Sequence, residues 1–269
     1  MRAVLKYPGS KWRIAPWILS NIPDHHTYVE PFFGSGAVLF LKKPSAIETV
    51  NDLDSDVINL FEVIRTRSEE LIRELGMTPY SREVYDRAFD AEPTGEVERA
   101  RNFLIRAWQG HGFRNTGIKV GWKNDVQGRE SAYALRNWNR LPKWILETVD
   151  RLKQVQIENR PALEVIERHN FEKCFLYLDP PYPLDVRAGK QYRHEMSERD
   201  HLQLLQTIRK SKAKIMISSY HSQMYAEELK GWYMDTMKNQ KEHGGQRTEI
   251  LWMNYLPPLA QMRLEELWD

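Results

Sequence analysis

The sequence predicts an α/β protein in which a mainly parallel sheet is interrupted by a long helical insertion. Short runs of apolar, β-branched and aromatic residues alternate with stretches of helical periodicity, an order typical of parallel strands joined by helices. Glycine or proline turns directly follow several of the apolar runs. The alternation stops between residues 65 and 151, where helical stretches and a glycine-rich section take its place.

The first part of the sheet, residues 1–64, contains two predicted strands. They cover residues 27–30 and 47–50, and a polar or glycine-containing turn follows each of them. Helices are predicted to begin after these turns, at Ala37 and at Asp54, and the second one carries apolar residues at helical spacing. This part therefore predicts two strand–helix units that lie side by side.

The second part, residues 152–269, resumes the alternation. Three strands are predicted at 155–158, 175–178 and 214–218, and two helices at 161–168 and 199–209. Two later apolar runs, 232–237 and 249–254, flank Gly244 and Gly245, which is the pattern of an antiparallel pair of strands. We therefore expect both parts to form one sheet domain that is covered by helices on both faces.

The insertion, residues 65–151, is predicted to be mostly helical and is basic. Helical periodicity is clear at 69–75 and 96–108, whereas 110–128 is irregular and rich in glycine. Residues 101–151 hold ten lysines and arginines against four acids, a net charge of +6, and four of the nine tryptophans. Basic side chains mixed with aromatic and amide groups suit a DNA surface, with an ordinary solvated loop as the alternative for the glycine-rich part.

The composition excludes several classes of protein. The whole chain carries 39 lysines and arginines against 37 acids, so it is not coated in positive charge. The single cysteine, Cys174, excludes a disulfide framework and a cysteine zinc site, and its apolar surroundings predict a buried strand. His194 and His201 lack a third ligand at suitable spacing, so we expect solvated histidines and no metal.

No apolar run approaches the ~18 residues that a membrane span needs. The first residues also lack an apolar stretch followed by a cleavage site, so no signal peptide is expected. These observations predict a cytoplasmic protein without membrane segments.

The sharpest motif is Asp179-Pro180-Pro181-Tyr182, directly after the predicted strand 175–178. Two prolines end the strand rigidly and place the flanking Asp and Tyr at the carboxyl edge of a parallel sheet, where such folds bind ligands. The group suits an exocyclic amine on a planar ring. Asp179 and the Pro180 carbonyl can accept its two hydrogens, and Tyr182 can stack on the ring. A surface Asp-Pro turn is the alternative.

Three weaker features precede this motif. Residues 29–36 end a strand in a glycine turn that opens a helix, but the glycine spacing is not that of a phosphate-binding motif, so a plain turn is an equal interpretation. Asp52 follows the next strand, where an acid can accept hydrogen bonds from both ribose hydroxyls or cap a helix. The basic glycine loop at 6–11 says little by itself.

In this order, the motifs resemble a known family. Lys-x-Pro-Gly-Ser-Lys (6–11), Val-Glu-Pro-Phe-Phe-Gly-Ser-Gly (29–36), Asn-Asp (51–52), a long insertion and Asp-Pro-Pro-Tyr (179–182) are similar to the Dam-like, D12 class DNA adenine-N6 methyltransferases. The resemblance covers most of residues 1–255 and matches the family's alpha arrangement. It implies a Rossmann-like, S-adenosylmethionine-dependent methyltransferase sheet with an inserted, mostly helical target-recognition domain at 65–151.

The resemblance also implies a reaction. The enzyme would transfer a methyl group from S-adenosylmethionine to N6 of adenine at specific sites in double-stranded DNA. The adenine would be flipped out of the duplex, and its amine would attack the methyl group in line without a covalent enzyme intermediate. Asp179, Pro180 and Tyr182 match the family's catalytic motif. The positions that match its cofactor contacts are Tyr7, Lys11, Glu30, Phe33, Gly34, Asp52 and Asp179.

DNA contacts are expected on the insertion and on two other segments. The residues are Lys6, Arg114, Asn115, Lys119, Lys123, Arg129, Arg187 and Lys190. The last two belong to the polar stretch 184–194, which we expect to close over the flipped base. The partner would be double-stranded DNA in the cytoplasm of a bacterial or phage-infected cell, with the protein a monomer or a weak dimer.

One departure from the family concerns the contact to the cofactor's adenine. Members usually carry an acid shortly after the strand that precedes Asp-Pro-Pro-Tyr. Here that stretch includes Pro161 at the matching position, with Glu158 and Asn159 close by.

Three alternatives stay open from the residues. An N4-cytosine or RNA amine methyltransferase uses similar proline-rich motifs. A nicotinamide enzyme is disfavoured by the glycine spacing. A DNA-binding relic without catalysis is disfavoured by the intact motif 179–182.

Overall fold

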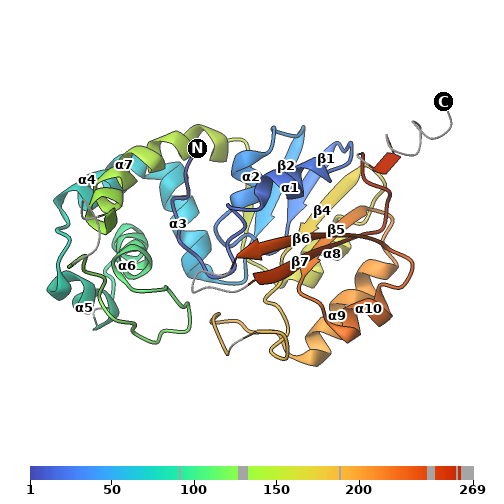
Figure 1. Cartoon of the computed structure of the whole chain (residues 1–269). Coiled ribbons are helices and arrows are strands. Elements are labelled where there is room, and N and C mark those ends of the chain that lie inside the picture. Colours follow the sequence, from blue (N-terminus) through green and yellow to red (C-terminus); the bar gives the residue numbers. More distant parts are fainter. Residues whose placement is uncertain (91, 127–132, 188, 241–245, 259, 262–269) are drawn as a thin grey trace.

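The computed structural model describes residues 1–90, 92–126, 133–187, 189–240, 246–258 and 260–261. Its strands are β1 (Thr27–Glu30), β2 (Ile47–Asn51), β3 (Gln156–Glu158), β4 (Cys174–Leu178), β5 (Lys214–Ser219), β6 (Tyr233–Gln240) and β7 (Gln246–Met253). They form one seven-stranded sheet in the order β3-β2-β1-β4-β5-β7-β6 (Figure 1).

The pairing of the strands confirms the predicted fold class. Strands β1 to β5 pair in parallel, whereas β7 is antiparallel to both β5 and β6. The order β3-β2-β1-β4-β5 is that of a doubly wound, Rossmann-like sheet, and the strand order reverses between β1 and β4. The predicted antiparallel pair near the C-terminus is β6 and β7, while its turn at Gly244 and Gly245 lies outside the described residues.

Helices follow most of the strands and fill the segment between β2 and β3. They are α1 (Ala15–Ser20), α2 (Ala37–Leu41), α3 (Ser55–Thr66), α4 (Ser68–Met77), α5 (Arg82–Asp90), α6 (Glu96–Gln109), α7 (Tyr133–Leu152), α8 (Ala162–Arg168), α9 (Glu198–Arg209) and α10 (Gln223–Glu228). The predicted helices correspond to α2, α3, α4, α6, α8 and α9, whereas α1, α5, α7 and α10 were not predicted individually.

The sheet is covered on both faces because alternate strand residues point to opposite sides. Tyr28, Phe175 and Tyr177 belong to one core cluster, together with residues of α1, α2 and α3. Val29 and Leu176 belong to a second cluster, whose helical members come from α8, α9 and α10. Figure 1 shows these two layers of helices above and below the sheet.

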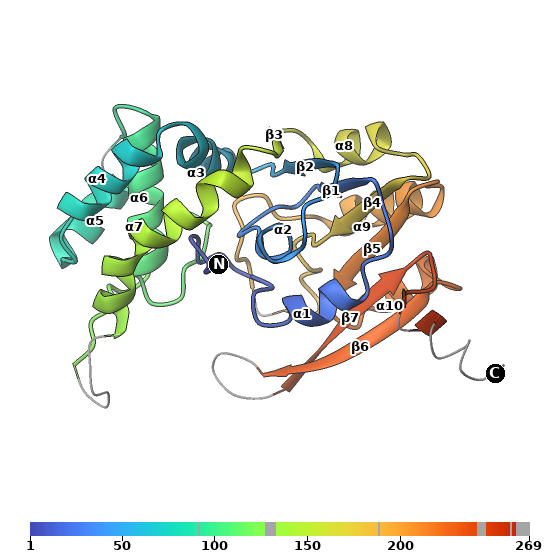
Figure 2. The same ribbon diagram turned by 90° about the horizontal axis from the view of Figure 1, so that it is seen from above.

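Helices α4 to α7 lie to one side of the sheet, next to α3, in both views (Figures 1 and 2). They do not have a separate core. Leu60 of α3, Phe103 of α6 and Leu141 of α7 belong to the cluster that also covers one face of the sheet. The Trp108 indole donates a hydrogen bond of 2.7 Å to the carbonyl of Val4, which joins α6 to the N-terminal segment. This helical segment is therefore packed as a continuation of the sheet's core.

A buried ion cluster joins the end of α7 to the sheet. Glu48 of β2 is almost completely buried and accepts hydrogen bonds from Lys42 at 2.5 Å and from Arg151 at 2.8 Å. Burial opposes ionisation of Glu48, but these hydrogen bonds prevail and hold its pKa below the usual range. The chain is thus fixed by charge where α7 returns to strand β3.

Two further sequence expectations have clear outcomes. Cys174 is buried in β4 as predicted, and burial raises the pKa of its thiol to about 12. The expectation of a solvated His201 is wrong. The residue is 1% exposed, its Nδ1 lies 3.0 Å from the Tyr225 hydroxyl, and burial lowers its pKa to about 4. In the part of the chain that is described, no helix is long and apolar enough to cross a membrane.

Candidate active site

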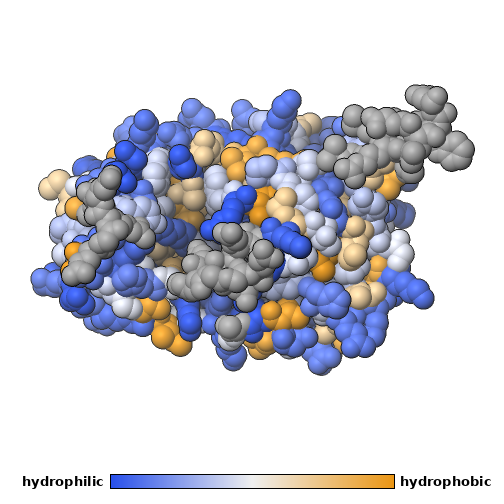
Figure 3. Space-filling model, viewed as in Figure 1, coloured by the Kyte–Doolittle hydropathy of each residue, from blue (hydrophilic) through white to orange (hydrophobic). Residues whose placement is uncertain are grey.

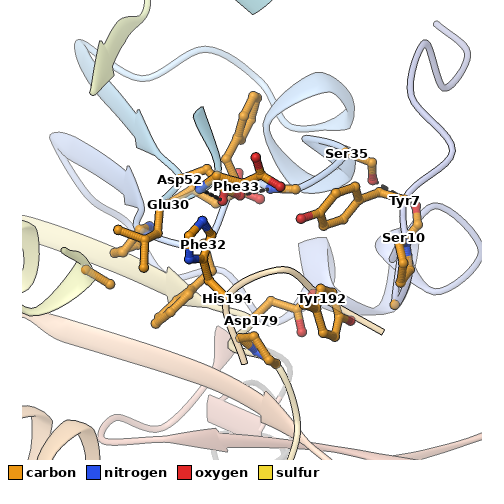
Figure 4. Close-up of a pocket in the computed structure, with 18 of the residues that line it drawn as sticks. Tyr7, Ser10, Glu30, Phe32, Phe33, Ser35, Asp52, Asp179, Tyr192 and His194 are labelled. Carbon is orange, nitrogen blue, oxygen red and sulfur yellow. Dashed lines mark hydrogen bonds between the residues drawn. The ribbon is translucent and has the colours of Figure 1, made fainter. Parts of the chain in front are cut away.

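A cavity of about 280 Å³ opens at the carboxyl edge of the sheet, where β1, β2 and β4 end. This volume is close to the lower end of the range for ligand pockets, ~300–1,000 Å³. The cavity lies at the point where the strand order reverses, the usual ligand position in a doubly wound sheet. Figure 4 shows Glu30 and Asp52 on one side of it, with Asp179 and Tyr192 on the other.

The glycine turn after β1 forms one wall. Gly34 has a φ of +48°, which favours glycine, and a Cβ at this position would lie 3.1 Å from the ring of Tyr7. The Gly34 N–H donates to Asp52 Oδ2 at 2.8 Å, and the Asp54 N–H donates to Asp52 Oδ1 at 2.9 Å. The turn therefore fixes Asp52 at the end of β2, beside the space that a ligand would occupy.

Two acids of this wall are held in unusual protonation states. Burial raises the pKa of Glu30 to about 8, although the Tyr28 hydroxyl donates to it at 2.9 Å. Burial also raises the pKa of Asp52 to about 7, although its two backbone hydrogen bonds lower it. Both groups are therefore poised to lose a proton near neutral pH when a positive charge arrives.

Asp179 faces the cavity directly after β4 and is fixed by two donors. Lys11 Nζ lies 2.8 Å from Asp179 Oδ1, and the Ser218 hydroxyl donates to the same oxygen at 2.7 Å. Lys11 is only 5% exposed, and it also donates to the carbonyl of Gly9 at 2.7 Å. Burial lowers the pKa of Lys11, but the attraction of Asp179 and Glu249 prevails and raises it. The lysine is therefore a charged partner that orients the carboxylate.

Tyr182, the last residue of the motif, is buried beside Asp179 and does not line the cavity. Its hydroxyl donates to Glu249 of β7 at 2.9 Å. Its ring meets the ring of Tyr220 edge-on, with centroids 4.6 Å apart, and Lys11 Nζ lies 4.8 Å from its centroid. Contacts of Tyr182 thus link the motif to Glu249 of β7 and to Tyr220, which directly follows β5. The sequence did not predict these contacts.

The rim of the cavity joins the helical segment to the sheet. Asn115 is 3% exposed, and its amide donates to Asp54 and, at 3.3 Å, to the hydroxyl of Tyr7. Arg193, from the segment after Asp-Pro-Pro-Tyr, donates to Asp54 at 3.1 Å and to Asp56 at 2.6 Å. Arg99 of α6 also donates to Asp56, at 2.6 Å.

The predicted DNA contacts differ in how far their side chains are exposed. Arg114, Lys119 and Lys190 are exposed, and Lys119 pairs with Asp86 at 2.8 Å. Lys6 lies over the Trp108 ring and Lys123 over the Tyr133 ring, so both are partly covered, and Arg129 lies outside the described residues.

Two of the predicted DNA contacts are turned inward. Asn115 is engaged in the rim as described. The side chain of Arg187 is 4% exposed. It pairs with Glu195 and donates to the Tyr182 carbonyl at 2.6 Å. In this structure both residues therefore hold neighbouring segments in place and do not present their polar groups on the outer surface.

The segment after Asp-Pro-Pro-Tyr contributes to the cavity more than the sequence indicated. Tyr192, His194 and Glu195 line it. Glu195 accepts hydrogen bonds from the backbone N–H groups of Gln191 and Tyr192, at 2.7 and 3.0 Å. The Tyr192 hydroxyl lies so close to Gly9 that a Cβ there would be 2.4 Å from it. The segment thus closes over the N-terminal loop.

The departure near Pro161 also has a structural outcome. Glu158 is turned toward Arg168 and does not line the cavity. The Asn159 amide donates to the carbonyls of Asp52 and Leu53, at 2.7 and 3.2 Å, so it fixes the loop after β2. Ala162 is the residue of this stretch that reaches the cavity wall. An acid from this stretch is therefore not part of the site.

Two serines of the motifs join the cavity walls, and two residues behind the wall carry no motif signal of their own. Ser10 and Ser35 share a hydrogen bond of 2.8 Å that joins the N-terminal loop to the glycine turn. Ser218 and Glu249 reach Asp179 and Tyr182 from β5 and β7. Only the strand order could have identified Ser218 and Glu249, because β5 lies beside β4 in the folded sheet and β7 lies next to β5.

Comparisons with known proteins identify the family to which this chain is similar. Residues 7–248 match the model of the D12 class N6 adenine-specific DNA methyltransferase family. The chain is 26% identical over 284 residues to "Type II methyltransferase M1.LlaDCHI" of Lactococcus lactis subsp. cremoris, covering 95% of this chain and 96% of that protein. It is 26% identical over 294 residues to "Type II methyltransferase M.MjaIII" of Methanocaldococcus jannaschii, covering 95% and 99%.

A shorter match joins the chain to the DNA adenine methylase of Escherichia coli K12, at 33% identity over 72 residues, 27% of this chain and 26% of that one. Among solved structures, a putative methyltransferase of Escherichia coli, yhhF, has a TM-score of 0.36 at 12% identity and covers 91% of this chain and 86% of that one. That structural similarity is distant, and the assignment of the fold is based on the strand order of the sheet.

The family match spans nearly the whole chain and includes the glycine turn, Asp52 and the Asp179–Tyr182 motif. These are the residues that the folded sheet brings together around one cavity. The chain belongs to the D12 class of N6 adenine-specific DNA methyltransferases.

Proposed function

We propose that this enzyme uses S-adenosylmethionine to methylate adenine in double-stranded DNA, after flipping the base out of the duplex. The observation that carries the proposal is the position of Asp179. Its carboxylate lies at the end of β4, is fixed by Lys11 and Ser218, and faces a cavity whose opposite wall holds Glu30 and Asp52. An acceptor for an exocyclic amine and a pocket for a cationic ligand are therefore neighbours.

The chemistry of the cavity fits this methyl donor. Glu30, Asp52, Asp54 and Asp179 line it, and the buried Lys11 among them is already paired with Asp179. An acidic pocket suits a ligand that carries a sulfonium and an ammonium group. When bound, S-adenosylmethionine supplies a methyl group on a positively charged sulfur, which a nitrogen can take in one displacement.

Within that pocket, each residue would have a separate binding task. Asp52 would accept hydrogen bonds from the ribose hydroxyls, as its place after β2 favours. Gly34 lets a ligand approach the backbone, and Tyr7 and Phe33 would pack against the apolar parts of the donor. Glu30 would face the ligand's positive charge.

Asp179 and Pro180 would hold the target amine. Lys11 and Ser218 both contact Asp179 Oδ1, which leaves Oδ2 to accept a hydrogen bond from the adenine N6. The carbonyl of Pro180 would accept the second hydrogen, so the nitrogen lone pair points at the methyl group. Asp179 supports the positive charge that develops on the amine, whose extra proton leaves after the transfer.

We infer that residues 65–151 are the target-recognition insertion. The basic segment 101–151 carries +6, and its exposed side chains include Arg114 and Lys119 near the loop that reaches the cavity rim through Asn115. The face in Figure 3 is largely hydrophilic with small, separated hydrophobic areas, which suits a polar, charged partner. DNA held there would lie beside the pocket, in the bacterial cytoplasm.

The test replaces Asp179 by Asn, which keeps an oxygen for Lys11 but cannot hold the negative charge. Methylation of DNA in cells that express each variant is read by sequencing with modified-base detection, which also gives the recognition sequence. We expect methylated adenine with the wild type and a loss of at least about 100-fold with Asp179→Asn, the usual size of one electrostatic contribution. Asp185→Asn, on the exposed part of the same segment, is the matched control. Methylated cytosine, or a variant with near-normal activity, would contradict the proposal.

A further inference from the structure

Glu249 occupies an unusual position for an acid. It lies in β7, is 5% exposed, and accepts a hydrogen bond from the Tyr182 hydroxyl at 2.9 Å. Because β7 runs antiparallel to β5, its beginning reaches the carboxyl edge of the sheet, where β4 and β5 end. The fold thus brings an acid to the active site that is 67 residues away from Tyr182 in the sequence.

The contacts around Tyr182 leave its ring little freedom. The hydroxyl is bound to Glu249, the ring edge meets Tyr220 at 4.6 Å between centroids, and Lys11 Nζ lies 4.8 Å from the centroid. Tyr220 is fixed in turn by Arg247, which donates to its hydroxyl at 3.1 Å. The hydrogen bond to Glu249 fixes the outer end of the ring's long axis, and the contacts with Tyr220 and Lys11 restrict rotation of the ring about that axis.

A buried carboxyl group needs a reason to be there. Burial raises the pKa of Glu249, while Lys11 and the hydrogen bond from Tyr182 lower it. An apolar residue at this place would avoid the desolvation of a carboxylate, which is costly unless the group is hydrogen-bonded or paired. The Glu249 carboxyl group contacts the catalytic motif through its hydrogen bond with Tyr182. It also attracts the charge of Lys11 and raises the pKa of that lysine.

We propose that Glu249 is a positioning residue of the reaction, which fixes Tyr182 and, with it, the Asp179–Tyr182 turn that would hold the flipped adenine. The inference rests on the proposed function, since the turn has that task only if a base enters the site. Glu249 itself does not contact the substrate. Its effect passes through the hydroxyl of Tyr182.

The experiment compares Glu249→Leu, Glu249→Gln, Tyr182→Phe and the double variant Tyr182→Phe/Glu249→Leu. Leucine removes the acceptor of the buried tyrosine hydroxyl, whereas the glutamine carbonyl can still accept its hydrogen bond. We expect kcat to fall roughly tenfold or more in Glu249→Leu, the range for an unpaired buried polar group. Glu249→Gln should recover most of this loss, and the affinity for S-adenosylmethionine should stay the same.

The double variant separates positioning from general support of the fold. If Glu249 acts through Tyr182, the two single changes break the same contact, so their effects are not additive and the double variant is no slower than the slower single one. Base flipping is measured with a duplex that carries 2-aminopurine at the methylated adenine. Its fluorescence rise on binding should shrink in Glu249→Leu and Tyr182→Phe alike.

Tyr225→Phe is the matched control, because its buried hydroxyl contacts His201 outside the active site. It should lower stability without changing the 2-aminopurine signal. Additive effects in the double variant, or a Glu249→Leu enzyme with normal kcat and normal base flipping, would overturn the inference while wild-type adenine methylation stands. If the wild-type enzyme did not methylate adenine, that result would instead contradict the proposed function.

Discussion

At the scale of single residues, the two acids Glu30 and Asp52 determine how the empty pocket behaves. Their pKa values, about 8 and about 7, lie well above the ~4 of exposed carboxyl groups because burial disfavours their charge. Between pH ~4 and the raised pKa values, Glu30 and Asp52 stay protonated in the folded protein, whereas the unfolded chain has released these protons. Stability of the ligand-free protein should therefore fall as pH rises from about 4 to about 8.

The same acids predict the pH dependence of cofactor binding. A protonated carboxyl group does not attract a cation, so the affinity for S-adenosylmethionine should rise as pH increases through about 7 to 8. Calorimetric titrations between pH 6 and pH 9 would measure this. Glu30→Gln, which cannot ionise, should bind more weakly and show a smaller pH dependence. An affinity that falls with pH would contradict the assignment of these acids to a cationic ligand.

The place of a residue in the structure was predictable where a sequence motif determined it. It was not predictable where packing against distant residues determined it. Asp179, Gly34 and Asp52 follow strands that their own apolar runs predict, and the structure places all three around the cavity. Asn115 and Arg187 have polar side chains in glycine-rich, basic stretches, so the sequence suggested exposure. Their inward orientation depends on partners far away in the chain, Asp54 and Glu195, which local pattern cannot reveal.

At the scale of elements, Arg151 joins the end of α7 to β2 through Glu48. Glu48 carries a lowered pKa, so its contribution to stability is present above the unfolded pKa of ~4.3 and is lost as pH falls. Removing Arg151 leaves the buried carboxylate with Lys42 as its charged partner. The anchor therefore contributes to holding the helical segment on the sheet.

We expect Arg151→Met to lower the free energy of unfolding by about 2 kcal/mol, less than the ~3–5 kcal/mol of a buried charge that loses its whole partner. The control is Lys153→Met, whose side chain is exposed and pairs with Asp150, so its effect should stay below about 0.5 kcal/mol. Urea denaturation at pH 7 measures both. Equal effects of the two substitutions would show that the buried cluster adds nothing to stability.

The strands were more predictable than the helices of the insertion. Buried strands of a parallel sheet are short and rich in apolar residues. β4 is a continuous apolar run, and β1, β2 and β5 mix apolar with polar residues but are short and end in recognisable turns. Helix α7 contains Pro142, a residue that normally ends a helix, and the preceding glycine-rich stretch hides its beginning. Its buried face, with Trp138, Leu141 and Ile145, becomes clear only in the packed structure.

At the scale of the whole molecule, charge is segregated. The chain carries +2, but residues 101–151 carry +6, so the remainder sums to −4. If the basic segment docks on phosphates, binding releases counterions and the affinity for DNA falls steeply with salt.

We predict that Arg114→Ala/Lys190→Ala lowers the salt slope of DNA binding by about 2, one for each phosphate contact. Both side chains are exposed near the active-site edge. The matched control is Lys173→Ala/Lys212→Ala, because these exposed lysines lie one and two residues before β4 and β5, at the opposite edge of the sheet. Fluorescence anisotropy from 50 to 300 mM salt gives the slopes. A slope unchanged in the first pair, or lowered in the second, would place the DNA elsewhere.

The single core shared by the helical segment and the sheet limits how this enzyme can acquire a new target sequence. Leu60, Phe103 and Leu141 belong to one buried cluster that spans the junction, so the helices cannot be exchanged as a block without opening the interior of the catalytic half. The loop that follows α6 is different, since Arg114, Ile118 and Lys119 point outward. Engineered changes of specificity should therefore be directed at that loop, with the helical scaffold left intact.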